Sequence, residues 1–599
     1  MKPYTRILSL LGVAIGAALL SGCDLTENMQ VKADKAMIFG SEAGLKAYSY
    51  SLYDMLPTTK SIFKQESGKC DYASCKTMNT FFVDGAYNSE SSTSWSWTNL
   101  HKINYFIDGL KSDVCTVDNA VRDNFLGIAR WFRAYFYYDK LKTYGEVPWF
   151  DHQIQNYERD YMYKDRDSRD VIIENIIADR DFAYENIQGD SEGNSLVSRY
   201  AAAALKSRAC LFEASFRKYH GIEGEKYSAE DLYAECVEAA SLVMNSGRFK
   251  LNTVAGNVGA YRELFYNETP DTGESILSIC ADAESEIFGE GNWYYNSASY
   301  GNGVCGVRPF VFTFLMADGT PFTAKENYEL LTYQDEFSGR DLRLAQIFRG
   351  PSYKMDNKNV VPDIITKVAM TGYHVIKFSM DSKSYDNGAK NPVGMPMIRY
   401  AEVLLNYAEA KAELDDLSDR DWANTIGAIR SRAGVKDLGI PSQVDEYMQQ
   451  TFYPDVTDAT IMEIRRERAI ELYLEGFRMD DLRKWKAGRL FEDLPWTGIH
   501  IPALDTPIDV NGDGVNDYYF SNSPVDSKSD SKDIWIQLGT EADGLWVDTN
   551  SKGGYDLVHR TVGGRRWYED GRQYLYPVPA KVIRDYTAEG YTISQNANW

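Results

Sequence analysis

Two short stretches of the sequence combine aromatic residues with amides and small flexible residues. The first, FFVDGAYNSESSTSWSWTN at 81–99, contains Tyr87, Asn88, Trp95 and Trp97. The second, FGEGNWYYNSASYGNG at 288–303, contains Asn292, Trp293, Tyr294, Tyr295 and Tyr300. Flat aromatic faces pack against the CH groups of sugar rings, while amides and carboxylates bind hydroxyls. Because the rings alternate with polar residues and glycines, we expect exposed ligand-binding aromatics in both stretches.

Inward packing is the alternative for both stretches. Trp97 directly precedes a helical pattern, so its indole could instead cover the core at the start of that helix. The rings around Trp293 could likewise pack beneath their own loop. Composition does not decide between these arrangements.

The stretch IDVNGDGVNDYYF at 508–520 has the spacing of a calcium-binding loop. Oxygen ligands at alternate positions, with a glycine at the bend, can wrap one hard cation. The ligands predicted from this spacing are Asp509, Asn511, Asp513, the backbone carbonyl of Val515, and Asp517. Phe520 stands where an EF-hand has a bidentate glutamate, which argues against a calcium sensor. A static structural calcium remains one interpretation and a solvated turn the other.

Motifs for catalysis are nearly absent from the sequence. GNGVCG at 301–306 matches G-x-G-x-x-G but lacks the strand-then-helix context of a dinucleotide site. The six histidines are scattered, without the spacing of metal ligands. Acidic pairs such as Asp480 with Asp481, or Glu463 with Glu467, are more typical of ion-paired helix surfaces than of a glycosidase acid and nucleophile. We therefore predict no catalytic residues and no required cofactor.

Hydrophobic patterns divide the chain into three parts. Residues 23–250 are mainly helical: Phe125, Ala129, Phe132 and Phe136 lie on one helix face. Residues 251–396 are rich in glycine, asparagine and tyrosine, and alternating stretches such as FVFTFL at 310–315 predict loops with a few short strands. Residues 397–599 begin with helical patterns and end in loops. The fold predicted from these patterns is mostly α.

Two helical patterns are expected in the last part, at 397–414 and near 460–486. In the second, Ile470, Tyr473, Leu474 and Phe477 form an i, i+3, i+4, i+7 stripe. Asp480 and Lys484 on the same pattern offer an i, i+4 ion pair.

The N-terminus reads as a leader rather than as part of the fold. Lys2 and Arg6 precede an uncharged run at 7–20, which is too short to span a bilayer comfortably. Leu20-Ser21-Gly22 followed by Cys23 resembles the lipobox of bacterial lipoproteins. That resemblance implies a signal peptide at 1–22, and acyl chains on Cys23 that anchor the mature protein at a membrane.

The charge of the chain argues against nucleic acid and anionic membranes as partners, and its cysteines indicate which disulfides are possible. The 599 residues carry a formal charge of −23, which repels nucleic acid and anionic membrane surfaces. Seven cysteines follow Cys23, an odd number without a C-x-x-C pair. Cys70 and Cys75 could close a small disulfide loop, whereas Cys210 and Cys236 lie in helical patterns typical of buried thiols.

Four separated segments behind the lipobox resemble the SusD/RagB family of outer-membrane nutrient-binding lipoproteins. They are RWFRAYFYYDKLKTYGEVPWF at 130–150, MIRYAEVLLNYAEAKAEL at 397–414 with AIRSRAGV at 428–435, IRRERAIELYLEGFRMDDLRKW at 464–485, and YLYPVP at 574–579 before the terminal QNANW. Any one of them could be an ordinary amphipathic helix or turn. Their order along the chain carries the resemblance, which spans essentially all of residues 23–599 as one domain.

The resemblance implies both a fold and a function. Helix pairs similar to tetratricopeptide repeats would form a scaffold, with a loop-rich irregular region carrying the ligand face. The implied function is a cell-surface lipoprotein of the outer membrane that captures oligosaccharides and delivers them to a TonB-dependent, SusC-like barrel. Two alternatives stay open: a peptide-binding member of the same family, and a surface glycoside hydrolase.

Overall fold

The computed structural model describes residues 35–189, 192–386, 390–524, 534–539, 544–561, 564–568 and 570–599. The predicted leader and the lipidation residue Cys23 lie outside the described residues. Within the described part of the chain, no helix combines the length and apolar character needed to cross a membrane.

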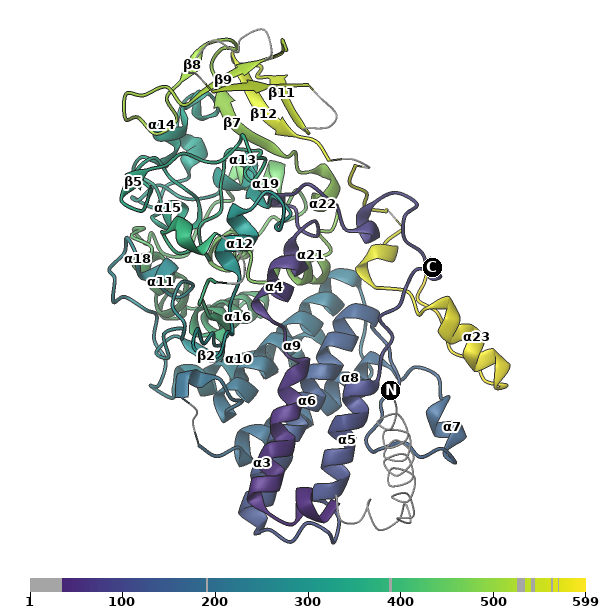
Figure 1. The fold of residues 1–599 in the computed structure, drawn as a ribbon. Helices are drawn as coiled ribbons and strands as arrows, with labels where there is room; N and C mark the ends of the chain where they lie inside the picture. Colours follow the sequence, from purple (N-terminus) through teal and green to yellow (C-terminus); the bar gives the residue numbers. More distant parts are fainter. Residues whose placement is uncertain are drawn as a thin grey trace, which may run out of the picture.

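The first part of the chain folds into a helical scaffold. Its helices are α3 (Glu42–Tyr50), α4 (Thr59–Glu66), α5 (Thr98–Leu110), α6 (Asn119–Tyr144), α7 (Arg159–Met162), α8 (Arg169–Asn186), α9 (Arg199–His220) and α10 (Ala229–Met244). The helix α6 packs against α5 and α8, and α9 packs against α8 and α10. Figure 1 shows these helices side by side at one end of the molecule. This arrangement confirms the predicted helix pairs.

The two longest helices show why this part is helical. The predicted face of α6 is buried, with Phe125, Ala129, Phe132 and Phe136 between 0% and 7% exposed. Gly145, with a φ of 77°, ends this helix in a conformation that favours glycine. The helix α9 begins at Ser198, whose Oγ accepts a hydrogen bond from the Ala201 amide at 3.2 Å.

The middle part is loop-rich, as predicted, but two of its elements differ from the prediction. Its short elements are α11 (Ala260–Glu263), β2 (Ser275–Ile279), α12 (Gly291–Asn296), β3 (Cys305–Gly306), α13 (Arg308–Val311), α14 (Tyr333–Phe337), α15 (Arg343–Ile347), β4 (Lys354–Met355), β5 (Lys358–Asn359) and β6 (Met395–Arg399). The stretch 310–315 is not a strand, because Pro309 starts the turn of helix α13. Residues 397–399 belong to strand β6, which pairs with β2, so the predicted helix begins only at Tyr400.

Helices return in the last part and pack on the scaffold. They are α16 (Tyr400–Glu413), α17 (Asp419–Trp422), α18 (Ala428–Arg432), α19 (Glu446–Thr451), α20 (Ala459–Glu471), α21 (Arg478–Lys484), α22 (Leu490–Asp493) and α23 (Ala580–Ala588). The helix α16 lies between α10 and α20. The predicted stripe from Ile470 to Phe477 is interrupted, because Leu474 and Gly476 adopt φ values of 59° and 93°. The predicted Asp480–Lys484 pair is also wrong, although both residues lie in α21: Asp480 pairs with Lys142 of α6 at 2.8 Å, and Lys484 pairs with Glu409 and Asp481.

Two small sheets complete the C-terminal region, at the end of the molecule opposite the scaffold (Figure 1). Strands β7 (Thr497–Ile501), β11 (Leu545–Thr549) and β12 (Tyr555–His559) form an antiparallel sheet in the order β11-β12-β7. Strands β8 (Pro507–Ile508), β9 (Tyr518–Ser521) and β10 (Trp535–Gln537) form the other, in the order β10-β9-β8. A further strand, β1 (Ala73–Ser74), pairs with β3.

The cysteines of the described residues are free thiols. Cys70 and Cys75 are buried side chains that hydrogen-bond to backbone carbonyls rather than to each other. Cys210 and Cys236 are fully buried in α9 and α10, as predicted.

Candidate ligand-binding site

The second aromatic stretch contains a stacked pair of rings. Trp293 of α12 and Tyr300 lie with ring centroids 3.4 Å apart and planes within 5° of parallel, and both side chains are half-buried. Lys60 of α4 places its ammonium 4.4 Å from the Tyr300 centroid. These contacts hold two aromatic rings in one preformed orientation.

Glu290 holds Tyr300 and Lys60 in place through its carboxylate. Its carboxylate accepts a hydrogen bond from the Tyr300 hydroxyl and lies 3.3 Å from the Lys60 ammonium. Burial, and then the Glu290 charge, raise the pKa of Tyr300, so the phenol stays protonated and donates. Glu290 itself has a φ of 61°, a conformation that few residues other than glycine adopt. We refer to Trp293, Tyr300, Lys60 and Glu290 as the aromatic platform.

The other predicted residues of this stretch are buried, which corrects the expectation that they are exposed. Tyr294 and Tyr295 are 4% and 1% exposed and pack on Phe63 of α4. Asn292 is fully buried, and its amide bonds to the backbone of Met380 through both Nδ2 and Oδ1. These three side chains of α12 face the core, whereas Trp293 lies half-buried on the outer side.

A cleft of about 320 Å³ lies beside the aromatic platform. It is lined by Lys64, Ser67, Thr77, Met78, Asn79, Tyr294, Tyr300, Gly301 and Asn302. Asn302 fixes one wall, because its Nδ2 donates to Ser67 Oγ and to the Thr77 carbonyl, each at 2.8 Å. An ordered cleft lined by hydroxyls, amides and two tyrosines is suited to a hydroxylated ligand.

Several members of this site were not predicted from the sequence. Lys60, Lys64 and Asn79 come from a region more than 200 residues before Tyr300. Nothing in their local pattern distinguishes them from other polar residues of short helices and turns. Glu290 lies within the second aromatic stretch, but its position between Tyr300 and Lys60 depends on the packing of α4 against this stretch.

The first aromatic stretch does not extend the platform. Tyr87 packs against Phe81, Tyr576 and Trp599, while the Asn88 side chain accepts hydrogen bonds from its own turn. Trp95 packs on Tyr144 of α6.

Trp97 follows the alternative of inward packing. It is half-buried, directly before α5, with its ring centroid 5.6 Å from that of Phe136 and 5.3 Å from that of Phe150. The rings of this stretch therefore attach the segment 80–97 to α6 and to the C-terminal segment.

A larger cavity, of about 780 Å³, lies where the end of α9 meets the C-terminal segment. His220, Lys486, Tyr568 and Arg572 are among its lining residues. The guanidinium of Arg572 lies 4.5 Å from the Tyr568 ring centroid, and Trp567 is only 1% exposed. Tyr568 is half-buried beneath this guanidinium, so the cavity has no pair of stacked rings like Trp293 and Tyr300 among its described lining residues.

The acidic pairs considered as catalytic groups belong to buried ion-pair networks. Glu467 is 1% exposed and contacts Arg343 and Arg430. Glu463 also pairs with Arg430. Asp481, 3% exposed, pairs with Arg468. The prediction of ion pairing is confirmed, although most of these groups lie in the interior rather than on a solvated surface.

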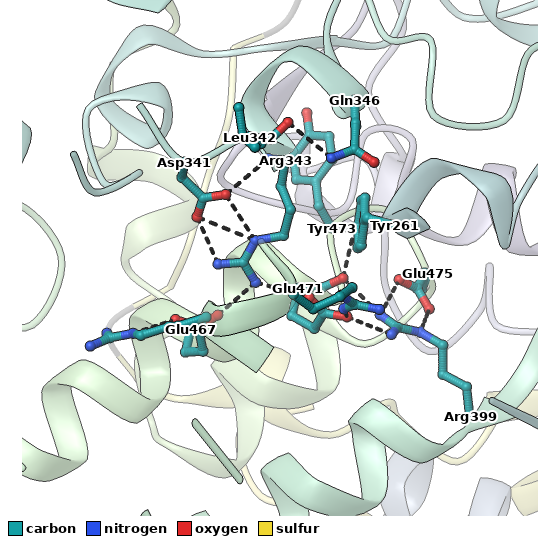
Figure 2. Close-up of polar contacts among 12 residues, drawn as sticks. Tyr261, Asp341, Leu342, Arg343, Gln346, Arg399, Glu467, Glu471, Tyr473 and Glu475 are labelled. Atoms are coloured by element: carbon teal, nitrogen blue, oxygen red, sulfur yellow. Dashed lines mark hydrogen bonds and ion pairs between the residues drawn. The ribbon is translucent and has the colours of Figure 1, made fainter. Parts of the chain in front are cut away.

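Glu471 is the centre of the largest of these networks. Figure 2 shows its carboxylate close to Arg343 and Arg399, and Arg432 is its third partner. Burial alone would raise the pKa of Glu471, but the charges of Arg432, Arg399 and Arg343 outweigh it and hold the pKa well below its usual value. The network joins α20 to β6, α15 and α18, and so connects the helices of the last part to the loop-rich part.

The predicted calcium loop is the turn between β8 and β9. The Asp509 carboxylate accepts hydrogen bonds from the amides of Gly512 and Gly514 at 2.7 and 2.9 Å. Asp513 accepts from Val515, and Asp517 accepts from Val510. Within the described ranges, no three His, Cys, Asp or Glu side chains are grouped to hold a metal ion. Calcium binding by this loop stays a prediction.

The fold and the cleft define a mostly helical protein with a preformed aromatic surface site. The chain belongs to the SusD family, whose sequence profile matches residues 274–599. It is similar to SusD-like protein P2 of Formosa agariphila, with 26% identity over 368 residues, which is 60% of this chain and 65% of that protein's length. The resemblance predicted from the four segments is thereby confirmed.

Solved structures share the fold over most of this chain. A SusD-like protein from Bacteroides fragilis has a TM-score of 0.64 at 20% identity, covering 94% of this chain and 98% of that chain. A SusD-like carbohydrate binding protein from the same organism has a TM-score of 0.64 at 19% identity, covering 92% and 99%. These similarities confirm the mostly helical fold.

Proposed function

We propose that this protein is a cell-surface receptor, anchored by lipid at Cys23, that binds oligosaccharides and delivers them to a TonB-dependent, SusC-like barrel of the outer membrane. The stacked Trp293–Tyr300 pair beside an ordered polar cleft carries the proposal. Stacked rings offer a flat apolar face, and the cleft offers groups for hydroxyls. Membership in the SusD family, and the carbohydrate binding named for one structural relative, support the same ligand class.

Calorimetric titration of the full-length protein in detergent with a panel of oligosaccharides tests the ligand. We expect Trp293→Ala to weaken binding about tenfold, equivalent to about 1.4 kcal/mol for one lost aromatic contact. Trp546→Ala is the matched control, because Trp546 is also a half-buried indole but belongs to strand β11. Binding of peptides without any oligosaccharide, or equal effects of both substitutions, would refute the proposed ligand site.

Purification in mild detergent tests the partner. We expect a SusC-like barrel to copurify with the wild-type protein, and its absence would contradict the delivery step. Glycan products appearing during incubation with the pure protein would favour the hydrolase alternative instead. The family relationship favours binding without turnover.

A further inference from the structure

The cleft beside the aromatic platform is basic, although the whole chain is acidic. Its nine lining residues include Lys64 and no carboxylate. Lys64 lies on the exposed side of α4, and no ion pair of its ammonium is found within the described residues. In a protein with a formal charge of −23, a ligand site with this composition is unusual.

Neighbouring charges do not cancel Lys64. Lys60, one turn earlier on α4, neutralises Glu290 at 3.3 Å, so the nearest carboxylate is already paired. Lys76 donates to the Ala298 carbonyl at 2.9 Å and holds the loop of the platform from the other side. Burial lowers the pKa of Lys76, and the charge of Lys367 adds to this effect, which places a further cation close by.

Within the described residues, Glu290 acts on Lys60 and Asp363 acts on Lys76, so neither carboxylate neutralises Lys64. The acidic residues elsewhere act weakly at the cleft, because salt screens charges over about 8 Å at physiological ionic strength. A local excess of positive charge therefore determines which ligands are attracted.

Neutral donors in the cleft complement the lysine. Asn79 uses its Oδ1 to accept from the Phe81 amide at 3.0 Å, and the same side chain lines the cleft. Ser67 Oγ accepts from Asn302 and is also hydrogen-bonded to Tyr294, so its hydroxyl orders the wall of the cleft. An ammonium, a hydroxyl and amide groups near an aromatic face suit a sugar that carries an anionic group.

We infer that the cleft selects acidic oligosaccharides, with a uronic carboxylate or a sulfate ester at Lys64 and a sugar ring on the aromatic platform. This inference rests on the proposed function and specifies its substrate class. Uronic acids and sugar sulfates share a hydroxylated ring with one negative charge close to it. Lysine binds such groups as a point charge, so either anion is accommodated.

Titration of the full-length protein in detergent with hexagalacturonate, a sulfated carrageenan oligosaccharide and neutral maltohexaose tests the inference. We expect at least one acidic probe to bind about tenfold more tightly than maltohexaose, and raising NaCl from about 50 to 500 mM to weaken that binding about fivefold. The carboxylated and sulfated probes distinguish the two anions. Equal or tighter binding of maltohexaose would overturn the inference.

Lys64→Gln is the decisive variant. It should weaken the acidic probe about fivefold and change maltohexaose binding less than about twofold. Lys581→Gln, on the exposed face of α23, is the matched control and should leave both unchanged. No effect of Lys64→Gln while Trp293→Ala still weakens binding would overturn the acidic selectivity alone. Binding insensitive to Trp293→Ala would overturn the proposed function itself.

Discussion

Replacing Glu471 with glutamine removes the central charge of the network in Figure 2 without changing the volume of the side chain. Glu471 is 0% exposed and contacts Arg343, Arg399 and Arg432. Without Glu471, Arg343 keeps Asp341 and Glu467, and Arg399 keeps Glu274 and Glu475. Arg432 keeps only Glu274, which it shares with Arg399. Glu471→Gln therefore removes one carboxylate from three buried guanidinium groups and leaves Arg432 with a single shared partner.

The expected cost is large for a single isosteric change. Breaking a buried ion pair by removing one partner lowers the free energy of unfolding by about 3–5 kcal/mol. For a chain of this length the entropy of unfolding is about 1.2 kcal/mol/K, which converts that loss into a fall in Tm of about 2.5–4 °C. The Tm of wild-type and variant protein, measured by calorimetry at pH 7 and one scan rate, gives the shift.

Glu238→Gln is the control, because Glu238 is an exposed glutamate on α10. Such a surface change should alter the free energy of unfolding by less than about 0.5 kcal/mol. Adding Arg432→Met to Glu471→Gln should restore part of the loss, since it removes the buried guanidinium that Glu471→Gln leaves with one shared carboxylate. Equal Tm shifts for Glu471→Gln and Glu238→Gln would refute the view that this network holds the loop-rich part on the helices of the last part.

Three further predictions follow from single sites. Burial lowers the pKa of His220 to about 4, whereas the unfolded value is about 6.5, so the unfolded chain binds more protons between these pH values. The free energy of unfolding should therefore fall by about 1–3 kcal/mol more in wild type than in His220→Gln as the pH drops from 6.5 to 4. Urea unfolding measures this fall, and an equal fall in both proteins would contradict the prediction. Calcium at about 5 mM should stabilise the native protein by about 1 kcal/mol through the loop at Asp509, and Asp509→Asn should abolish the effect; an unchanged Tm would exclude the site. Cys23→Ala should release the protein from the membrane fraction, and retention there would refute the lipid anchor.

Much of the scaffold was predictable because its helices repeat their apolar residues at a regular period. Phe125, Ala129, Phe132 and Phe136 fall on one face in sequence and in structure. The predictions were wrong where the backbone conformation does not follow the apolar pattern. Gly476 interrupts the apolar stripe between two helices. Pro309 lies in the first turn of a helix, although the residues after it alternate as in a strand.

The candidate site was only half predictable for a related reason. Composition identified Trp293 and Tyr300, but it could not separate them from Tyr294 and Tyr295, which pack on Phe63 from a distant part of the chain. Lys60 and Lys64 reach the site only through tertiary packing, and no local spacing connects them to residue 300. The four SusD-like segments predicted the fold well because they cover its core helices rather than its ligand surface.

Hydroxyl-radical footprinting of the full-length protein, with and without a saturating oligosaccharide, tests most directly whether a glycan binds at the aromatic platform. We expect the oxidation of Trp293 and Tyr300 to fall several-fold in the presence of ligand, while Trp546 is oxidised equally in both states. Protection of Tyr568 in the C-terminal cavity, with Trp293 and Tyr300 unchanged, would contradict it.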